Sequence, residues 1–106
     1  MEGIIMNIKI NSVRFTPTQK LSDFVEAKVK KLGTYSDEII SAEIFLKLEN
    51  TQDLENKVVE IRLEVPGNEV FAKKKTKSFE ESVDNVIAAL KKQITKHKEK
   101  RKSLVQ

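Results

Sequence analysis

The residues of this chain whose spacing most clearly indicates a chemical role are lysines near its end. At helical spacing they form two rows: Lys92, Lys96 and Lys100 follow one another at i, i+4, and Lys91 and Lys98 lie at i, i+7. Like charges at i, i+4 cost a helix about 0.2–0.5 kcal/mol per pair, so such a row favours an anion lying among them. The alternative is a solvated lysine face near the helix C-terminus, where cations favour the macrodipole. Because that dipole effect fades within a turn and Lys91 and Lys92 lie further inside, phosphate binding is the favoured interpretation.

The charge of the whole chain is concentrated in the same region. Residues 71–106 carry 11 Lys and Arg against 4 Asp and Glu, whereas residues 1–70 carry 9 against 12. A positive end on a mildly acidic body indicates a directed surface for a polyanion. A solubilising basic tail explains the charge alone equally well.

Two further lysines lie in an earlier segment with a helical pattern. At about 100° per residue, Lys28 falls within the apolar arc of this predicted helix, and Lys31 lies near it. The amine of Lys28 either snorkels along a neighbour into water or emerges in a groove between the two predicted helices. In the second arrangement, both helices line one positive channel that suits a phosphate backbone.

Four more lysines precede the last predicted helix, at positions 73, 74, 75 and 77. In a strand, Lys74 points to the side of Ala72, and Lys73 and Lys75 point to the other side. With Lys77 they are expected to widen the basic patch near the start of the helix. An edge strand protected by lysines against aggregation is nearly as good an explanation.

The complete set of predicted RNA-binding residues is therefore basic: Lys28, Lys31, Lys73, Lys74, Lys75, Lys77, Lys91, Lys92, Lys96 and Lys98. Aromatic residues are scarce, with five Phe, one Tyr and no Trp. Recognition of the backbone and shape of folded RNA is consequently better supported than stacking on single-stranded bases.

Catalysis finds little support in the sequence. The only histidine, His97, lies between two lysines, and the chain has no cysteine, so a zinc site lacks ligands. Three glycines, at positions 3, 33 and 67, leave no phosphate-binding glycine loop. We therefore expect a protein that is not an enzyme and uses no cofactor, metal or small-molecule substrate.

Hydrophobic periodicity predicts the elements that must position these lysines. Strands are expected at 6–15, 41–49, 57–65 and 69–76, and helices at about 18–32 and 78–100. Each strand alternates apolar and polar residues, which predicts an α+β domain of order β-α-β-β-β-α. Its four-stranded sheet carries two helices packed on one face.

Local signals mark the ends of the predicted elements. Thr18 is the expected N-cap of the first helix and Gly33 its C′ residue, while Ser78 and Glu81 form a capping box for the second. Pro66-Gly67-Asn68 predicts a hairpin. Residues 1–106 are read as one domain with flexible ends at 1–5 and about 101–106.

The N-terminal segment does not have the pattern of a signal peptide, and no segment is apolar enough to span a bilayer. We expect a cytoplasmic protein without membrane association. It is also expected to be a monomer in isolation.

Several stretches together resemble the ribosome hibernation promoting factor and ribosome-associated inhibitor proteins, also called the sigma-54 modulation family. The stretches are Met6-Asn7-Ile8 with Phe15-Thr16-Pro17, Lys28-Val29-Lys30-Lys31-Leu32, Val65-Pro66-Gly67-Asn68, Ser78-Phe79-Glu80-Glu81-Ser82-Val83-Asp84, and Leu90-Lys91-Lys92-Gln93-Ile94 with Lys96. The resemblance covers about residues 6–100. It departs from the family pattern at Ser78, Glu80 and Ser82.

The resemblance implies a fold similar to double-stranded RNA-binding domains. It also implies a protein that binds small-subunit ribosomal RNA in the tRNA and mRNA channel and inactivates ribosomes during stationary phase or stress. Basic family positions match Lys28, Lys31, Lys92 and Lys96, and the length of 106 residues matches the short form. Two alternatives stay open: a protein–protein adaptor that uses the exposed sheet face with Phe45, and a general module for structured RNA.

Overall fold

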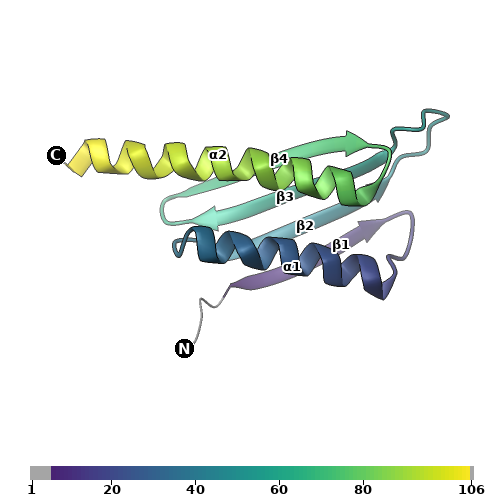
Figure 1. Cartoon of the computed structure of the whole chain (residues 1–106), viewed down its shortest axis with the longest axis horizontal. Coiled ribbons are helices and arrows are strands. Elements are labelled where there is room, and N and C mark those ends of the chain that lie inside the picture. Colours follow the sequence, from purple (N-terminus) through teal and green to yellow (C-terminus); the bar gives the residue numbers. More distant parts are fainter. Residues whose placement is uncertain (1–5, 106) are drawn as a thin grey trace.

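The computed structural model describes the backbone of residues 6–105 and the side chains of residues 6–96. Its elements follow the predicted order (Figure 1): β1 (Asn7–Val13), α1 (Gln19–Tyr35), β2 (Ser41–Leu48), β3 (Lys57–Val65), β4 (Asn68–Thr76) and α2 (Phe79–Val105). The predicted elements are all present, with ends that shift by up to five residues.

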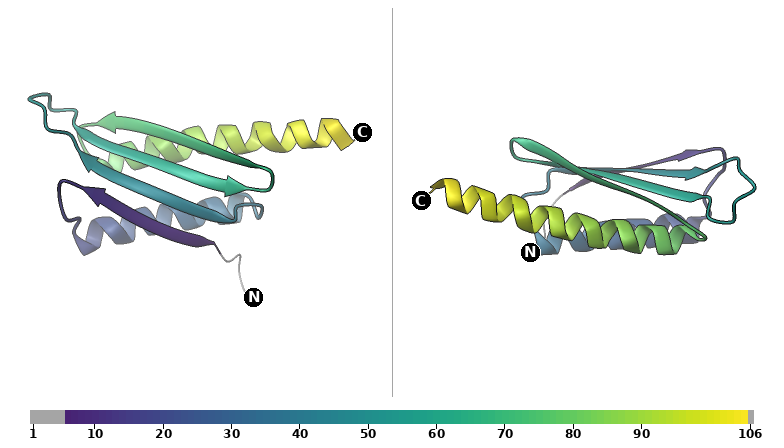
Figure 2. Two further views of the ribbon diagram at one scale, coloured as in Figure 1. Left: turned by 180° about the vertical axis from the view of Figure 1, so that it is seen from behind. Right: turned by 90° about the horizontal axis from the view of Figure 1, so that it is seen from above.

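The four strands form one mixed sheet in the order β1-β2-β3-β4. β1 pairs with β2 in parallel, because α1 carries the chain back across the sheet, and the two later pairings are antiparallel. Both helices lie on one face of the sheet, and the other face carries no helix (Figure 2). The predicted α+β class and the two-layer arrangement are confirmed.

The core lies between the sheet and the two helices, where the apolar stripes of both layers meet. The helices contribute buried side chains at the predicted spacing: Leu21, Val25, Val29 and Leu32 from α1, and Val83, Val86, Ile87, Leu90 and Ile94 from α2. The sheet contributes alternate residues of its central strands: Ala42, Ile44, Leu46, Val59, Ile61, Leu63 and Val65. Full burial of each large apolar side chain contributes about 1.5–3 kcal/mol, which holds the helices firmly against the sheet.

The beginning of α1 agrees with the prediction, but its end does not. The backbone N–H of Leu21 donates to Oγ1 of Thr18 at 3.1 Å, which confirms the N-cap. The prediction of Gly33 as a C′ residue is wrong, because the helix continues to Tyr35 and its C-cap is Ser36. Gly33 is instead buried inside the helix, where an added Cβ would lie 3.1 Å from Cε of Met6.

Only half of the predicted capping box of α2 forms. The backbone N–H of Glu81 donates to Oγ of Ser78 at 3.1 Å. The N–H of Ser78 donates to Oγ1 of Thr76 at 3.3 Å rather than to the Glu81 carboxylate. The helix then extends to Val105, beyond the predicted end near residue 100. Of the ends predicted to be flexible, 1–5 and about 101–106, the structure describes only the backbone of 101–105, which belongs to α2.

The predicted hairpin between β3 and β4 is confirmed. Val65 pairs with Asn68, so Pro66 and Gly67 form a two-residue loop. Gly67 has a φ of 74°, a conformation that side chains disfavour and glycine adopts freely.

Candidate nucleic-acid interface

The two helices lie side by side and run in the same direction (Figure 1). Two contacts set their register: Lys28 meets Asp84, and seven residues further along each helix Tyr35 meets Lys91. Seven residues are about two helical turns, so both contacts lie on the same side of each helix. The boundary between the helices therefore forms one continuous strip.

Lys28 reaches this boundary, as one of the two predicted arrangements requires. Its Nζ lies 3.1 Å from Oδ1 of Asp84 and 5.4 Å from the centroid of the Phe24 ring. The side chains of Lys28 and Asp84 are 36% and 53% exposed. Because exposed ion pairs contribute only about 0–1 kcal/mol, a stronger anion can take the place of Asp84.

Lys31 lies on the same side of α1 and is exposed. At about 100° per residue, Lys28, Lys31 and Tyr35 fall within an arc of about 60°. Among the residues that the structure describes, Lys31 pairs with no carboxylate. Both lysines of α1 that were predicted to bind RNA are thus directed toward the strip.

The lysines of α2 gather further along the strip, around an open hollow of about 390 Å³. Its lining residues are Tyr35, Lys91, Lys92, Gln93, Thr95 and Lys96. Three of these six residues carry ammonium groups and none carries a carboxylate. The predicted gathering of Lys91, Lys92 and Lys96 is therefore observed, with an aromatic ring beside them.

Tyr35 was not singled out in the sequence, and its position is well defined. Its hydroxyl group is hydrogen-bonded to Oγ1 of Thr95, and the Thr95 hydroxyl in turn donates to the backbone oxygen of Lys91 at 2.9 Å. The Lys91 ammonium lies 5.8 Å from the centroid of the ring. A signal was available, because Tyr35 lies seven residues after Lys28 and therefore on the same side of α1. Asp84, the partner of Lys28, was missed as well.

The lysines of β4 do not all join this strip. The cross-strand partners of Lys73 and Lys75 are Glu60 and Val58, which lie on the face without helices, and Nζ of Lys75 lies 3.3 Å from Oε1 of Glu49. Lys74 points to the helix side, as predicted, opposite Val59. The expectation that all three widen the patch at the start of α2 is therefore wrong for Lys73 and Lys75, because the face to which they point carries no helix.

Two predicted positions remain to be placed. Lys77 is exposed in the turn between β4 and α2, at the end opposite the hollow. Lys98 lies outside the described side chains, as do His97 and Lys100. The backbone of α2 continues through these positions.

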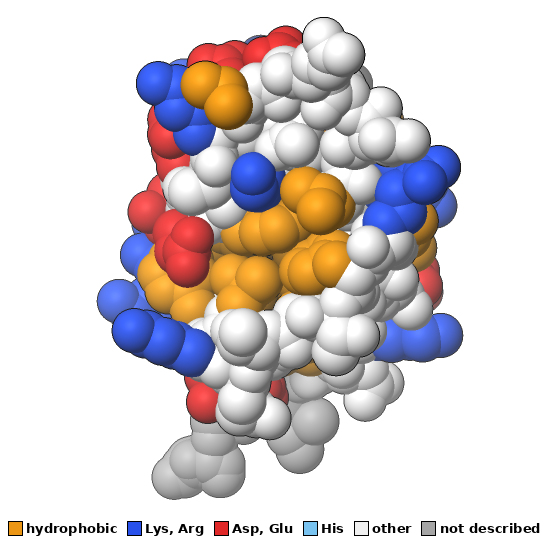
Figure 3. Space-filling model, turned by 90° about the vertical axis from the view of Figure 1, so that its right-hand side faces the viewer, with side chains coloured by type: hydrophobic (Ala, Val, Ile, Leu, Met, Phe, Trp, Pro, Cys, Tyr) orange, Lys and Arg blue, Asp and Glu red, His pale blue; other side chains and the backbone are white. Residues whose placement is uncertain are grey.

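The end of the molecule at which both helices begin has a different character. There the rings of Phe15 and Phe79 stack with centroids 4.8 Å apart and an interplanar angle of 14°. Figure 3 views the molecule from this end, with hydrophobic side chains in the middle and Lys and Arg groups on both sides. The hollow with its three lysines lies toward the other end.

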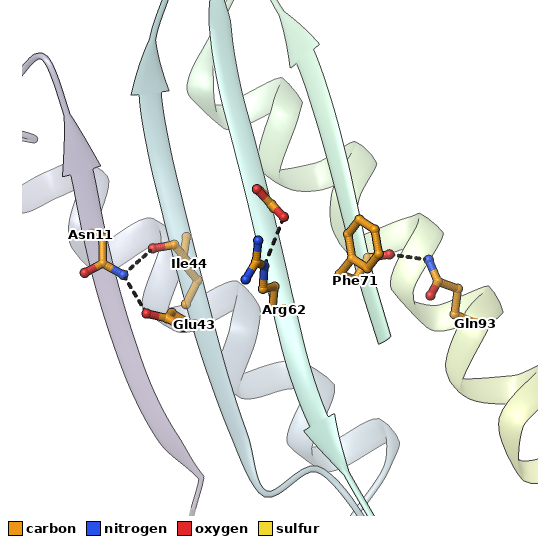
Figure 4. Close-up of polar contacts among 7 residues, drawn as sticks. Asn11, Glu43, Ile44, Arg62, Phe71 and Gln93 are labelled. Carbon is orange, nitrogen blue, oxygen red and sulfur yellow. Dashed lines mark hydrogen bonds and ion pairs between the residues drawn. The ribbon is translucent and has the colours of Figure 1, made fainter. Parts of the chain in front are cut away.

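The open face of the sheet carries mixed charges (Figure 4). Nε of Arg62 donates to Oε2 of Glu60 at 3.1 Å, and this hydrogen bond, with the charge of Glu60, raises the pKa of Arg62 above its ordinary value. The guanidinium carbon of Arg62 lies 5.4 Å from the centroid of the Phe45 ring. Asn11 donates to Oε2 of Glu43 at 3.3 Å. The carboxylates beside Arg62 and Lys75 make this face a poorer phosphate site than the strip.

Other kinds of site find no support among the described residues. In residues 6–96, no cluster of three or more His, Cys, Asp or Glu is arranged to hold a metal ion. Within the part that the structure describes, neither helix is long and apolar enough to cross a membrane.

Comparisons with known proteins agree with this architecture. Residues 8–102 match the family model described as sigma 54 modulation protein / S30EA ribosomal protein. A ribosome hibernation promoting factor of Pseudomonas putida is 32% identical over 101 residues, which cover 95% of each chain. A ribosome hibernation promoting factor of Escherichia coli is 34% identical over 97 residues, which cover 92% of this chain and 96% of the relative.

Solved structures show the same fold. A ribosomal subunit interface protein from Coxiella burnetii superposes with a TM-score of 0.78 at 22% identity, over 88% of this chain and 98% of that one. The N-terminal domain of Protein Y from Thermus thermophilus gives a TM-score of 0.74 at 26% identity, over 87% of this chain and 99% of that one. With the family model matched over nearly the whole chain, the protein described here belongs to the sigma 54 modulation protein / S30EA ribosomal protein family.

Proposed function

We propose that this protein binds small-subunit ribosomal RNA in the tRNA and mRNA channel and keeps ribosomes inactive during stationary phase or stress. The observation that carries the proposal is the gathering of Lys91, Lys92 and Lys96 around a hollow without carboxylates. Lys28 and Lys31 extend this positive strip along the neighbouring helix. The names of the relatives, ribosome hibernation promoting factor and ribosomal subunit interface protein, support the same target.

The proposed mechanism is occupancy rather than catalysis. A strip of ammonium groups on two parallel helices follows a ribose-phosphate backbone, and release of its counterions drives binding. A protein seated in the channel excludes tRNA and messenger by its volume alone. It needs no cofactor for this action, which takes place in the cytoplasm, where ribosomes are.

The decisive experiment is sedimentation of a stationary-phase lysate through a sucrose gradient. The protein is expected in the ribosome fractions at low salt and in the light fractions at high salt, because the contacts are electrostatic. A protein that stays in the light fractions at low salt would contradict the proposal and favour the adaptor alternative.

A pair of matched variants locates the binding surface. Lys92→Glu with Lys96→Glu is expected to abolish co-sedimentation with the small subunit, since neither lysine pairs with a carboxylate among the described residues. Lys47→Glu with Lys73→Glu changes the net charge equally on the open face of the sheet. This control is expected to keep co-sedimentation, and equal losses in both variants would contradict a site on the helices.

A further inference from the structure

We infer that the hollow beside Tyr35 is a binding site for one unpaired nucleotide, whose base stacks on the Tyr35 ring while its phosphates contact Lys91, Lys92 and Lys96. This inference rests on the proposed function and deepens it. Lysines on a helix bind any phosphate backbone, whereas a stacking ring selects RNA with an unpaired base.

The Tyr35 ring is both accessible and held in place. The residue is 44% exposed, although a large aromatic side chain normally gains free energy from burial. The hydrogen bond from its hydroxyl group to Thr95 ties the end of α1 to α2 and holds the long axis of the ring in place. A ring whose axis is held before binding loses less conformational entropy when a base stacks on it.

The charges around the ring fit a nucleotide. Three lysines line the hollow with Tyr35, and no lining residue is acidic. The Lys91 ammonium lies 5.8 Å from the ring centroid, held there by a weak cation–π attraction. It can therefore move to a phosphate while the ring receives the base.

Phe71 is a second exposed aromatic residue, but its surroundings do not suit a phosphate as those of Tyr35 do. Phe71 is 54% exposed on the open sheet face, and its cross-strand neighbour is Arg62. That cation is hydrogen-bonded to Glu60, and Glu69 lies two residues before Phe71 on the same face. Carboxylates there repel a phosphate. Tyr35 combines an exposed ring with cations and no carboxylate among the residues of its hollow.

The experiment compares two RNA duplexes of equal length, one fully paired and one with a single bulged 2-aminopurine. The wild-type protein is expected to bind the bulged duplex about tenfold more tightly and to quench the fluorescence of the bulged base, since stacking on an aromatic ring provides this much affinity. Tyr35→Leu should lose this preference and keep its affinity for the paired duplex within about twofold, because the phosphate contacts remain.

Two controls keep the result interpretable. Tyr35→Phe retains the ring without the hydroxyl group and should keep the preference, and Phe71→Leu should behave like the wild type. Quenching by the wild type reports stacking even if Tyr35→Leu fails to fold. An Asp- and Glu-rich peptide should compete with RNA to the same extent for the wild-type protein and for Tyr35→Leu. A peptide affinity that depends on Tyr35 would identify a protein ligand and overturn the inference.

The failures of the two proposals are distinguishable. Equal affinity of the wild type for both duplexes, absence of quenching, or a preference that survives Tyr35→Leu would overturn the inference and leave the proposed function standing. Absence of binding to either duplex at low salt would overturn both.

Discussion

Lys28 of α1 and Asp84 of α2 form an ion pair that joins the two helices at the surface, with Nζ and Oδ1 3.1 Å apart. The same carboxylate that holds the lysine in the strip also competes with RNA for it. Because both side chains keep contact with water, the pair positions the ammonium group at little cost in binding. This dual role leads directly to a test.

Asp84→Asn is expected to raise the affinity for structured RNA by about two- to fivefold at low salt, because Lys28 becomes free for a phosphate. The free energy of unfolding should change by less than about 1 kcal/mol. Filter binding and thermal unfolding measure the two effects. Glu26→Gln removes the Glu26–Lys30 ion pair on the side of α1 away from α2 and serves as the control; an equal gain in both variants would contradict the role of Asp84.

The salt dependence of RNA binding should report the number of lysines that contact phosphate. If six helix lysines do so, namely Lys28, Lys31, Lys91, Lys92, Lys96 and Lys98, the slope of log K against log salt should be about −4 to −5. Lys96→Gln should make this slope less steep by about 0.7–0.9, and Lys47→Gln on the open face should leave it unchanged. An affinity independent of salt is incompatible with the proposed mechanism.

Ser82→Ala should destabilise the fold without changing RNA affinity. Ser82 is fully buried, and its hydroxyl donates to the backbone oxygen of Lys57 at 2.7 Å. Its loss leaves a partly buried acceptor without this donor, which costs about 1–3 kcal/mol. Chemical denaturation measures the change, with exposed Ser12→Ala as the control at less than about 0.5 kcal/mol. Equal stability of the two variants would show that the hydrogen bond contributes nothing.

Gly33→Ala is expected to stabilise the protein by about 0.5–1 kcal/mol, because the glycine lies inside a helix. The new Cβ meets only the flexible end of Met6, which can shift by a few tenths of an ångström. Gly67→Ala should lower stability by about 1–2 kcal/mol instead, since its φ is positive. Thermal unfolding of both variants provides the measurement, and a loss of stability in Gly33→Ala would mean that Met6 cannot move.

Much of the fold could be predicted because the signals are local. Alternation along 57–65 placed Val59, Ile61 and Leu63 on one face of a strand, and all three are buried. A stripe at helical spacing did the same for Val83, Val86 and Leu90. The prediction at Gly33 was wrong, since glycine occurs both just after the end of a helix and at positions where another chain segment packs closely.

The candidate site was predictable only in part. Lys92 and Lys96 are spaced i, i+4 on one helix, so their proximity follows from helical geometry alone. The position of Lys91 beside the Tyr35 ring depends on how the two helices pack. Strand alternation predicted that Lys73 and Lys74 point to opposite faces of the sheet. Which of the two faces carries α2 was decided only by the arrangement of sheet and helices. Nothing in the local sequence showed that Tyr35 lies against Thr95.

The sequence by itself determined the elements, their buried faces and the excess of positive charge on the last helix, because periodicity and composition act over short distances along the chain. Only the tertiary structure decided the partners: Asp84 beside Lys28, and Tyr35 among the lysines of α2. The register between two helices depends on how their side chains pack against one sheet. That packing joins residues more than fifty positions apart, which no local pattern encodes.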